Sequence, residues 1–297
     1  MSLLVSVVVV TYRKFDNIRK AITSILNQDY PHIELIVSDD GSPNFPREQI
    51  ESIIESLGHN NIESVQIIHH EKNVGTVKNI NYAYYKAKGD ILFPLAGDDC
   101  LYTNTVVSQV AAHFNDTSSN VLVTSRVICN NGKAIYTLPL KKNLKKIKKL
   151  STPYLQHRAI IREQFYDMAS GSVLYIRKSF FIKVGGFDES YRLWEDGPFI
   201  TKFTNENTID TRYDIQSIVY STDGISNSGT NSLMRVDRLH YNETDRICGY
   251  EGLDIFTKRT VDYINKRYKA EDKIAVAILY VKYLDVIWSK ILYRLGI

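Results

Sequence analysis

The stretch that decides the fold is Val5-Ser6-Val7-Val8-Val9-Val10, a nearly unbroken run of β-branched residues close to the amino terminus. Such residues favour extended backbone, and a strand without polar alternation is typical of a parallel sheet covered on both faces. Ile18, Ile22 and Ile25 follow at the spacing of one helical face. Asp16 precedes them, where an N-cap is expected. The amino terminus therefore predicts a strand followed by a helix.

The same order of apolar run and helical pattern recurs three times after this unit. The further strands are expected at Ile33–Val37, Val65–Ile68 and Ile91–Leu95. In the helix between the first two of these, the residues expected to face inward are Ile50, Ile53, Ile54 and Leu57. Four β–α units imply a parallel, doubly wound sheet, which we assign to residues 1–115.

The second half of the chain has a mixed pattern. Strands are expected at Val121–Cys129, Ala134–Leu138 and Ser172–Arg177. Asn131-Gly132 predicts a tight hairpin turn between the first two. This part, residues 116–230, is therefore expected to complete the domain as mixed α/β structure.

Helical patterns dominate the C-terminal region, residues 231–297. The last helix is expected around Ile274–Tyr293, and it is so apolar that it needs a partner. Packing on the main domain is the expected arrangement. An oligomer contact, which would make the protein a homo-oligomer, and docking on a membrane are the alternatives.

Length and composition favour a globular cytoplasmic protein. The 297 residues, 44% of them hydrophobic, suffice for one large α/β domain with a helical annex. Cys100, Cys129 and Cys248 are widely spaced, which is typical of a reducing compartment. The amino terminus lacks the basic region and cleavage site of a signal peptide. No apolar run approaches the ~20 residues needed to cross a bilayer.

Six lysines are concentrated between Pro139 and Pro153, interleaved with Leu140, Leu144 and Ile147 at helical spacing. Two interpretations stay open for this segment. It is either a solvated loop or a basic amphipathic helix that docks on an anionic membrane or a phosphorylated acceptor. Nucleic acid is not an expected partner, because no aromatic platform is interleaved with the lysines.

Two acidic pairs stand directly after apolar runs, Asp39-Asp40 and Asp98-Asp99. In an open α/β sheet, ligands bind beyond the carboxyl ends of the strands, so both pairs can converge on one site. Adjacent carboxylates repel each other, and a hard cation that bridges an anionic ligand offsets this cost. The pairs thus indicate a hard divalent cation such as Mn²⁺ or Mg²⁺, an anionic ligand bridged by that cation, or a cationic partner, and a diphosphate held by a metal fits them. A solvated turn is the alternative for either pair alone.

These elements belong to an ordered series of motifs. The series comprises Val5–Tyr12, Asp39-Asp40-Gly41-Ser42, Asn73-Val74-Gly75 with Lys78-Asn79, Gly97-Asp98-Asp99, Gly185-Gly186-Phe187-Asp188 and Glu195-Asp196. In this order and spacing, the chain resembles glycosyltransferase family 2, the inverting enzymes of GT-A fold that use nucleotide sugars. The resemblance implies a Rossmann-like, mainly parallel twisted sheet flanked by helices. It also implies that residues 1–115 bind the nucleotide sugar and residues 116–230 the acceptor.

For the nucleotide, the resemblance implies roles for four residues. Thr11 and Tyr12 match positions that line the base. Asp40 matches the acid that recognises uracil, whose ring N–H a carboxylate can accept. Lys78 lies where a basic residue could approach the diphosphate.

For the chemistry, the resemblance implies that Asp98 and Asp99 hold the divalent metal and that Asp196 is the catalytic base. Ala96 replaces an acid that the family often has there, so ligation should rest mainly on Asp99, with Asp98 touching ribose or metal. A metal held by carboxylates stabilises the charge of a departing nucleoside diphosphate. A carboxylate on the opposite sugar face deprotonates the acceptor hydroxyl.

The function implied is transfer of a single sugar from a UDP-sugar to a glycan or lipid-linked acceptor, in synthesis of a bacterial surface polysaccharide at the inner face of the cell membrane. Single transfer is expected because no Gln-x-x-Arg-Trp signature follows Asp196. A catalytically silent UDP-sugar-binding or membrane scaffold protein is the alternative. A nicotinamide-dependent oxidoreductase is disfavoured, since the segment 11–16 lacks the Gly-x-Gly-x-x-Gly loop.

Overall fold

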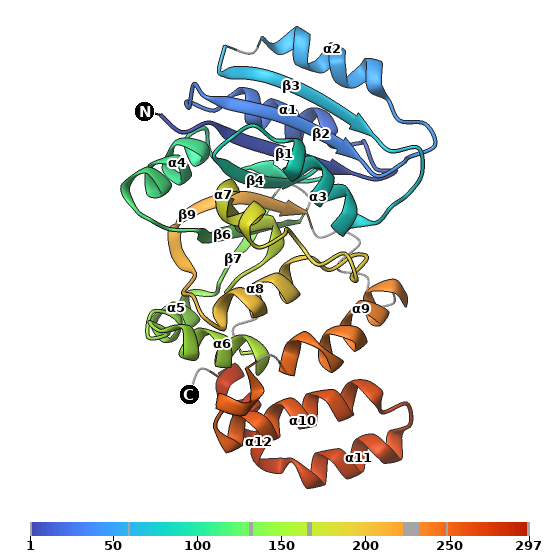
Figure 1. The fold of residues 1–297 in the computed structure, drawn as a ribbon, viewed down its shortest axis with the longest axis vertical. Helices are drawn as coiled ribbons and strands as arrows, with labels where there is room; N and C mark the ends of the chain where they lie inside the picture. Colours follow the sequence, from blue (N-terminus) through green and yellow to red (C-terminus); the bar gives the residue numbers. More distant parts are fainter. Residues whose placement is uncertain are drawn as a thin grey trace.

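The structure, a computed structural model, describes residues 2–58, 60–130, 133–164, 168–221, 232–247 and 249–295. The sheet and its helices occupy most of an elongated molecule, and helices of the C-terminal region form one end (Figure 1). The strands are β1 (Val5–Thr11), β2 (Ile33–Asp39), β3 (Ile62–His69), β4 (Ile91–Ala96), β5 (Cys100–Leu101), β6 (Val121–Asn130), β7 (Lys133–Leu138), β8 (Leu174–Arg177) and β9 (Asp210–Ser221). The α-helices are α1 (Ile18–Leu26), α2 (Arg47–Leu57), α3 (Thr76–Lys86), α4 (Val106–Asp116), α5 (Lys141–Ile147), α6 (Pro153–Ile161), α7 (Lys178–Lys183), α8 (Asp196–Thr204), α9 (Ser232–Glu243), α10 (Ile255–Lys269), α11 (Lys273–Lys282) and α12 (Leu284–Leu295).

The first part of the sheet is parallel, in the order β3-β2-β1-β4. Val5 pairs with both Ile33 of β2 and Ile91 of β4, so β1 lies between them. Residues 5–9 are fully buried, as expected of a strand covered on both faces. The four strands expected in the first half of the chain are confirmed.

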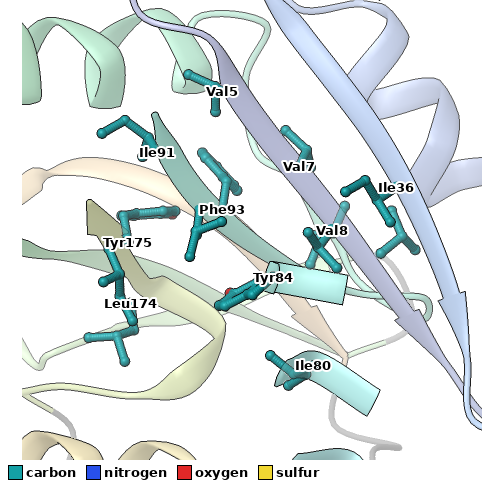
Figure 2. Packing of buried hydrophobic residues seen from close by; sticks show 14 of the residues in the cluster. Val5, Val7, Val8, Ile36, Ile80, Tyr84, Ile91, Phe93, Leu174 and Tyr175 are labelled. Carbon is teal, nitrogen blue, oxygen red and sulfur yellow. The ribbon is translucent and has the colours of Figure 1, made fainter. Parts of the chain in front are cut away.

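The second part of the sheet continues from β4 in the order β8-β6-β9-β5, with β7 paired to β6. β8 runs antiparallel to β4 and β6, whereas β9 runs parallel to β6. Figure 2 shows Phe93 of β4 beside Tyr175 of β8, and their ring centroids lie 4.3 Å apart. The two parts therefore share one core, and the strand-end face extends across both.

β9 and the two-residue β5 are not predicted from the sequence. Asp210, Arg212 and Asp214 put charges into the first half of β9 and obscure its apolar alternation. The structure accommodates two of these charges as a surface pair, with 2.6 Å between the Arg212 guanidinium and the Asp214 carboxylate. Tertiary pairing with β6 thus overrides a weak local pattern.

Two local expectations about helices are wrong. Asp16 is exposed, and α1 begins after Asn17, whose side chain makes no capping hydrogen bond. Leu57 is 44% exposed because α2 ends there, beyond the core that Ile50 and Ile54 reach.

The expected last helix, Ile274–Tyr293, is also wrong, because two helices, α11 and α12, occupy this stretch. The break lies at Tyr283, which is buried against Tyr263 of α10 and donates a hydrogen bond to Asp262. The chain therefore folds back, and α10, α11 and α12 form a small core of their own. Among the described residues, no helix combines the length and apolar character required to span a bilayer.

The lysine-rich segment forms α5, and its apolar side faces the protein. Ile147 is buried against Ala159 and Met168. Ile147, one of the three apolar residues of this segment, is therefore not available to enter a membrane, and docking of the segment on a membrane stays a prediction. The turn expected at Asn131-Gly132 and the residue Cys248 lie outside the described residues.

Candidate active site

A cleft of about 990 Å³ opens beyond the carboxyl ends of β1 and β4. This volume accommodates a ligand of nucleotide-sugar size. The cleft is lined by residues that the sequence analysis selected from separate motifs: Thr11, Tyr12, Asp40, Asp98, Asp99 and Asp196. Carboxylates from three distant segments thus converge on one site, as the strand-end rule predicts.

Asp39, the first acid of its pair, fastens the strand ends together. Its fully buried carboxylate accepts hydrogen bonds from the Thr11 hydroxyl (3.0 Å), the Ser42 N–H (2.7 Å) and the Ser42 hydroxyl (2.6 Å). It also bonds to Nδ1 of His69 (2.9 Å). This acid therefore positions Thr11 and the turn after β2 rather than a ligand.

Asp40 borders the cleft and anchors the loop that precedes α3. Its carboxylate accepts hydrogen bonds from the backbone N–H groups of Val74 (2.7 Å) and Gly75 (3.1 Å) and from the Asn73 amide (2.8 Å). Burial raises the pKa of Asp40, while these N–H donors act in the opposite direction. Recognition of a base by Asp40 must use the oxygen lone pairs that this loop leaves open.

Asp98 and Asp99 lie on a tight turn after β4. The Gly97 N–H donates to the Val10 carbonyl (2.9 Å), and the Asp99 N–H donates to the Ala96 carbonyl (3.0 Å). A Cβ at Gly97 would lie 2.7 Å from Cγ2 of Thr11, so only glycine allows β1 and this turn to approach so closely. Both residues line the cleft.

This donor set fits a hard divalent cation. Within the described ranges there is no group of three or more His, Cys, Asp or Glu side chains placed to hold a metal. A Mg²⁺-type ion needs only one or two carboxylates when phosphate oxygens and water complete its shell. Asp98 and Asp99 supply that number, and oxygen is the ligand atom that such ions prefer.

Asp196 is the first residue of α8 and also lines the cleft. Its carboxylate accepts hydrogen bonds from the N–H groups of Gly171 (2.5 Å) and Gly197 (2.7 Å). Two N–H donors, one to each carboxylate oxygen, hold it in one orientation. It can therefore act as a fixed proton acceptor for a group bound in the cleft.

The comparison that decides the family covers most of this cleft. Residues 6–183 match the profile described as Glycosyl transferase family 2. The chain belongs to glycosyltransferase family 2. The matched segment contains the Asp40 and Asp98-Asp99 wall, and it ends before Asp196.

Sequence relatives of this family member carry matching names. An uncharacterised glycosyltransferase of Rickettsia typhi is 28% identical over 209 residues, which cover 69% of this chain and 60% of the relative. An uncharacterised glycosyltransferase of Haemophilus influenzae is 24% identical over 251 residues, covering 81% and 78%. The chain thus spans only part of the length of these relatives.

Solved structures confirm the GT-A fold of this family 2 chain. The 1–349 fragment of TarS from S. aureus, in complex with UDP-GlcNAc, matches with a TM-score of 0.61 at 20% identity, covering 89% of this chain and 71% of that one. The mannosyltransferase PcManGT from Pyrobaculum calidifontis, in complex with GDP-Man and Mn²⁺, gives a TM-score of 0.61 at 14% identity, covering 99% and 83%. At these identities the likeness concerns the fold.

Glu195 is an acid of this glycosyltransferase site whose importance the sequence analysis missed. Its carboxyl lines the cleft beside Asp196 and makes no capping hydrogen bond to α8. Burial raises the pKa of Glu195, and the neighbouring Asp196 carboxylate raises it further. A Cβ on Gly171 would lie 2.5 Å from Oε1 of Glu195, so the backbone closes directly over this group.

The raised pKa makes stability depend on pH. Because the folded protein binds this proton more tightly than the unfolded chain, the free energy of unfolding should fall as pH rises from the ordinary pKa of 4.5 towards the raised one. Glu195→Gln keeps the shape without the charge. At pH 8 its free energy of unfolding, measured by urea denaturation, should therefore exceed that of the unmodified protein by at least about 1 kcal/mol. At pH 4 this gain should be absent. Equal differences at both pH values would contradict this assignment.

Asp237 of α9 holds the loop that leads into Glu195-Asp196. Its carboxylate, only 4% exposed, accepts hydrogen bonds from three successive N–H groups, those of Arg192 (3.1 Å), Leu193 (2.7 Å) and Trp194 (3.1 Å). No local sequence pattern indicates this contact. Asp237 also lies beyond the residues that the family profile matches.

Lys78 is not among the residues that line the cleft, which corrects its expected approach to a diphosphate. It is exposed on α3 between the buried Val77 and Asn79, so its helical position directs it to solvent. Lys14 and Arg192 line the cleft instead. Arg192 donates to the Asn73 side chain (2.6 Å), which places it beside the Asp40 loop.

Proposed function

We propose that the cleft transfers a single sugar, with inversion, from a UDP-sugar to a glycan or lipid-linked acceptor. The observation that supports this proposal is that Asp98 and Asp99, on the turn after β4, and Asp196, at the start of α8, line one and the same cleft. A displacement at the anomeric carbon needs a leaving group on one sugar face and a base on the other. Asp98 and Asp99 for the leaving group and Asp196 for the base would meet both needs without a covalent nucleophile.

At the turn after β4, Asp99 and Asp98 would hold a divalent metal, Mn²⁺ or Mg²⁺, together with the donor diphosphate. The metal would neutralise negative charge that builds up on the diphosphate as it departs. Lys14 and Arg192 add positive charge at the same cleft and have the chemistry to contact phosphate oxygens. Thr11 and Tyr12 would line the base.

At the start of α8, Asp196 would accept the proton of the acceptor hydroxyl. The N–H groups of Gly171 and Gly197 fix its carboxylate before any ligand binds, so little reorganisation is needed during the reaction. The raised pKa of Glu195 keeps a second negative charge away from Asp196 near neutral pH.

Uracil is our proposed donor base, supported by Asp40 at the cleft. TarS was solved with UDP-GlcNAc and PcManGT with GDP-Man, so the fold is compatible with either nucleotide. Replacement of Asp40 would also release the Asn73–Gly75 loop. The comparison of UDP with GDP in the unmodified protein is therefore the cleaner test, and equal affinities would reject the uracil assignment.

UDP binding should require both a divalent cation and Asp99. Calorimetry should show that Mn²⁺ strengthens UDP binding at least about tenfold, because unscreened carboxylates repel a diphosphate. Asp99→Ala should remove this gain. Asp116→Ala, at an exposed carboxylate at the end of α4, is the matched control and should retain it. A metal-dependent affinity that survives in Asp99→Ala would refute the metal site.

The acceptor is proposed to belong to a bacterial surface polysaccharide made at the inner face of the cell membrane. Peripheral contact with that membrane is better supported at α11 and α12 than at α5. The exposed large apolar side chains there are Ile274, Ile278, Val281, Leu284, Trp288 and Ile291. Lys273 and Lys282 stand at the two ends of α11, where cationic groups favour an anionic surface. The same surface would serve a homo-oligomer.

Vesicle sedimentation separates the two surfaces. Replacing Leu284, Trp288 and Ile291 with Ser should reduce binding to anionic vesicles at least about tenfold, because each buried CH₂ contributes about 0.8 kcal/mol. The α5 variant, with Lys145 and Lys146 replaced by Gln, should lose much less. Loss in the α5 variant alone would place the contact on the lysines. Absence of binding by the unmodified protein would favour the oligomer.

The alternative of a catalytically silent UDP-sugar-binding or scaffold protein predicts the same UDP affinity but no turnover. Donor hydrolysis, which needs no acceptor, distinguishes the two.

A further inference from the structure

Two arginines line the part of the cleft around Asp196, which we call the Asp196 wall, and lack a carboxylate partner. Arg126 of β6 and Arg238 of α9 both line the cleft, and each is partly buried. Within the residues that the structure describes, neither guanidinium lies within 4.0 Å of an Asp or Glu oxygen. A guanidinium is always charged, and removing it from water is costly unless a negative charge compensates.

The contacts of these two arginines are all with neutral groups. Arg126 donates to the hydroxyls of Ser170 (2.6 Å) and Ser172 (3.2 Å) and lies 4.8 Å from the ring centroid of Tyr220. Arg238 donates to the Tyr268 hydroxyl (3.3 Å) and lies 5.0 Å from the ring centroid of Trp194. Hydroxyls and rings orient the two guanidinium groups without neutralising them.

Two other cations of the cleft, Arg246 and Lys290, are paired with a carboxylate of the protein itself. Arg246 is 3% exposed and pairs with Glu163 at 2.9 Å, and Lys290 pairs with the other oxygen of the same carboxylate at 3.3 Å. Arg126 and Arg238 therefore differ from Arg246 and Lys290 in having charge left over for a ligand.

The contacts of these two arginines place them near Asp196 rather than near the Asp98-Asp99 pair. Ser170 and Ser172, which hold Arg126, flank Gly171, whose N–H binds Asp196. Arg238 covers Trp194, two residues before Asp196. Arg192, by contrast, is bound to Asn73 beside Asp40.

We propose that Arg126 and Arg238 form an anion subsite that binds a phosphate group carried by the acceptor. The subsite rests on the proposed function, since it assigns the ligand of the Asp196 wall. Phosphate is favoured because its several oxygens match the donors that line this part of the cleft, two planar guanidinium forks and the hydroxyls of Ser170 and Ser172. Such a phosphate could be part of a glycan or of a lipid carrier.

Calorimetry on the protein saturated with UDP and Mn²⁺ tests the subsite with matched probes. Glycerol 3-phosphate is compared with glycerol, and farnesyl phosphate with farnesol in detergent. Each phosphorylated probe should bind at least about tenfold more tightly than its neutral partner. Tighter binding of farnesyl phosphate than of glycerol 3-phosphate would indicate a lipid-borne phosphate, and equal binding a glycan-borne one. No preference for either phosphorylated probe would overturn the proposal.

Variants identify the side chains. Arg126→Gln and Arg238→Gln should each reduce the phosphate preference about tenfold, with partial recovery in the Lys variants, which keep the charge but lose the fork. Arg259→Gln, at an exposed arginine paired with Asp285, is the control and should change nothing. In Arg192→Gln the UDP affinity should fall instead. If Arg126→Gln and Arg238→Gln weaken UDP as much as the probes, the arginines serve the donor, and the subsite is wrong.

Failure of the proposed function gives a different result. A protein that binds no UDP at any metal concentration would refute the nucleotide-sugar site. The same probe pairs measured without nucleotide would still report whether Arg126 and Arg238 prefer phosphate.

Discussion

Asp196→Asn should lower the turnover of a UDP-sugar by about 10² or more while its binding persists. The amide keeps the shape of the side chain but cannot accept the proton of the attacking hydroxyl. Turnover can be followed as acceptor-free hydrolysis of the donor, and binding by calorimetry with UDP and Mn²⁺. The predicted signature is a loss in kcat with little change in donor affinity.

Two features make this experiment discriminating. Asp214→Asn, at an exposed acid paired with Arg212 outside the cleft, provides a matched control of the same chemistry. The competing explanation is that Asp196 merely supports the start of α8, since it accepts the Gly197 N–H. Near-normal turnover combined with a lower unfolding midpoint in Asp196→Asn would favour that structural role.

Asp237→Ala should lower both stability and turnover. The change leaves the N–H groups of Arg192, Leu193 and Trp194 without their common acceptor, and we expect a loss of about 3 kcal/mol in the free energy of unfolding. The loop that carries Glu195 and Asp196 would shift, and a displacement near 1 Å can reduce turnover about 10²-fold. Urea denaturation and donor hydrolysis measure the two effects.

A conservative variant separates positioning from general destabilisation. Asp237→Asn keeps one acceptor oxygen and should recover part of both losses. Glu243→Gln, at an exposed position on the same helix, should affect neither. Full turnover in folded Asp237→Ala would show that the loop does not depend on this carboxylate.

The parallel half of the fold and the place of Asp98-Asp99 at the cleft were accessible from the sequence because their signals are local. Residues 5–10 announce a buried strand through composition alone, and Asp98-Asp99 follows directly on a strand end. The strand-end rule then places Asp40 and Asp98 in one cleft without knowledge of contacts. These predictions depend on neighbouring residues and on one topological rule.

The Asp196 wall was harder to predict from the sequence because it is built by long-range contacts. Asp237 reaches back to residues 192–194 across more than forty positions, and Arg126 meets Ser170 only once β6 and β8 are paired. For Lys78 a local signal was misleading. Its place beside a motif suggested a contact with phosphate, but its position on α3 directs the side chain to solvent. The single long helix expected near the carboxyl terminus failed because the burial of Tyr283 overrides a continuous apolar pattern.

The most direct test of the central claim is donor hydrolysis without acceptor. The protein is incubated with Mn²⁺ and a panel of UDP- and GDP-sugars, and free nucleoside diphosphate is measured by chromatography. The account predicts slow release of UDP from at least one UDP-sugar, which stops when the metal is chelated and is absent in Asp99→Ala. Release that continues unchanged without metal and in Asp99→Ala, or no release from any nucleotide sugar, would contradict it.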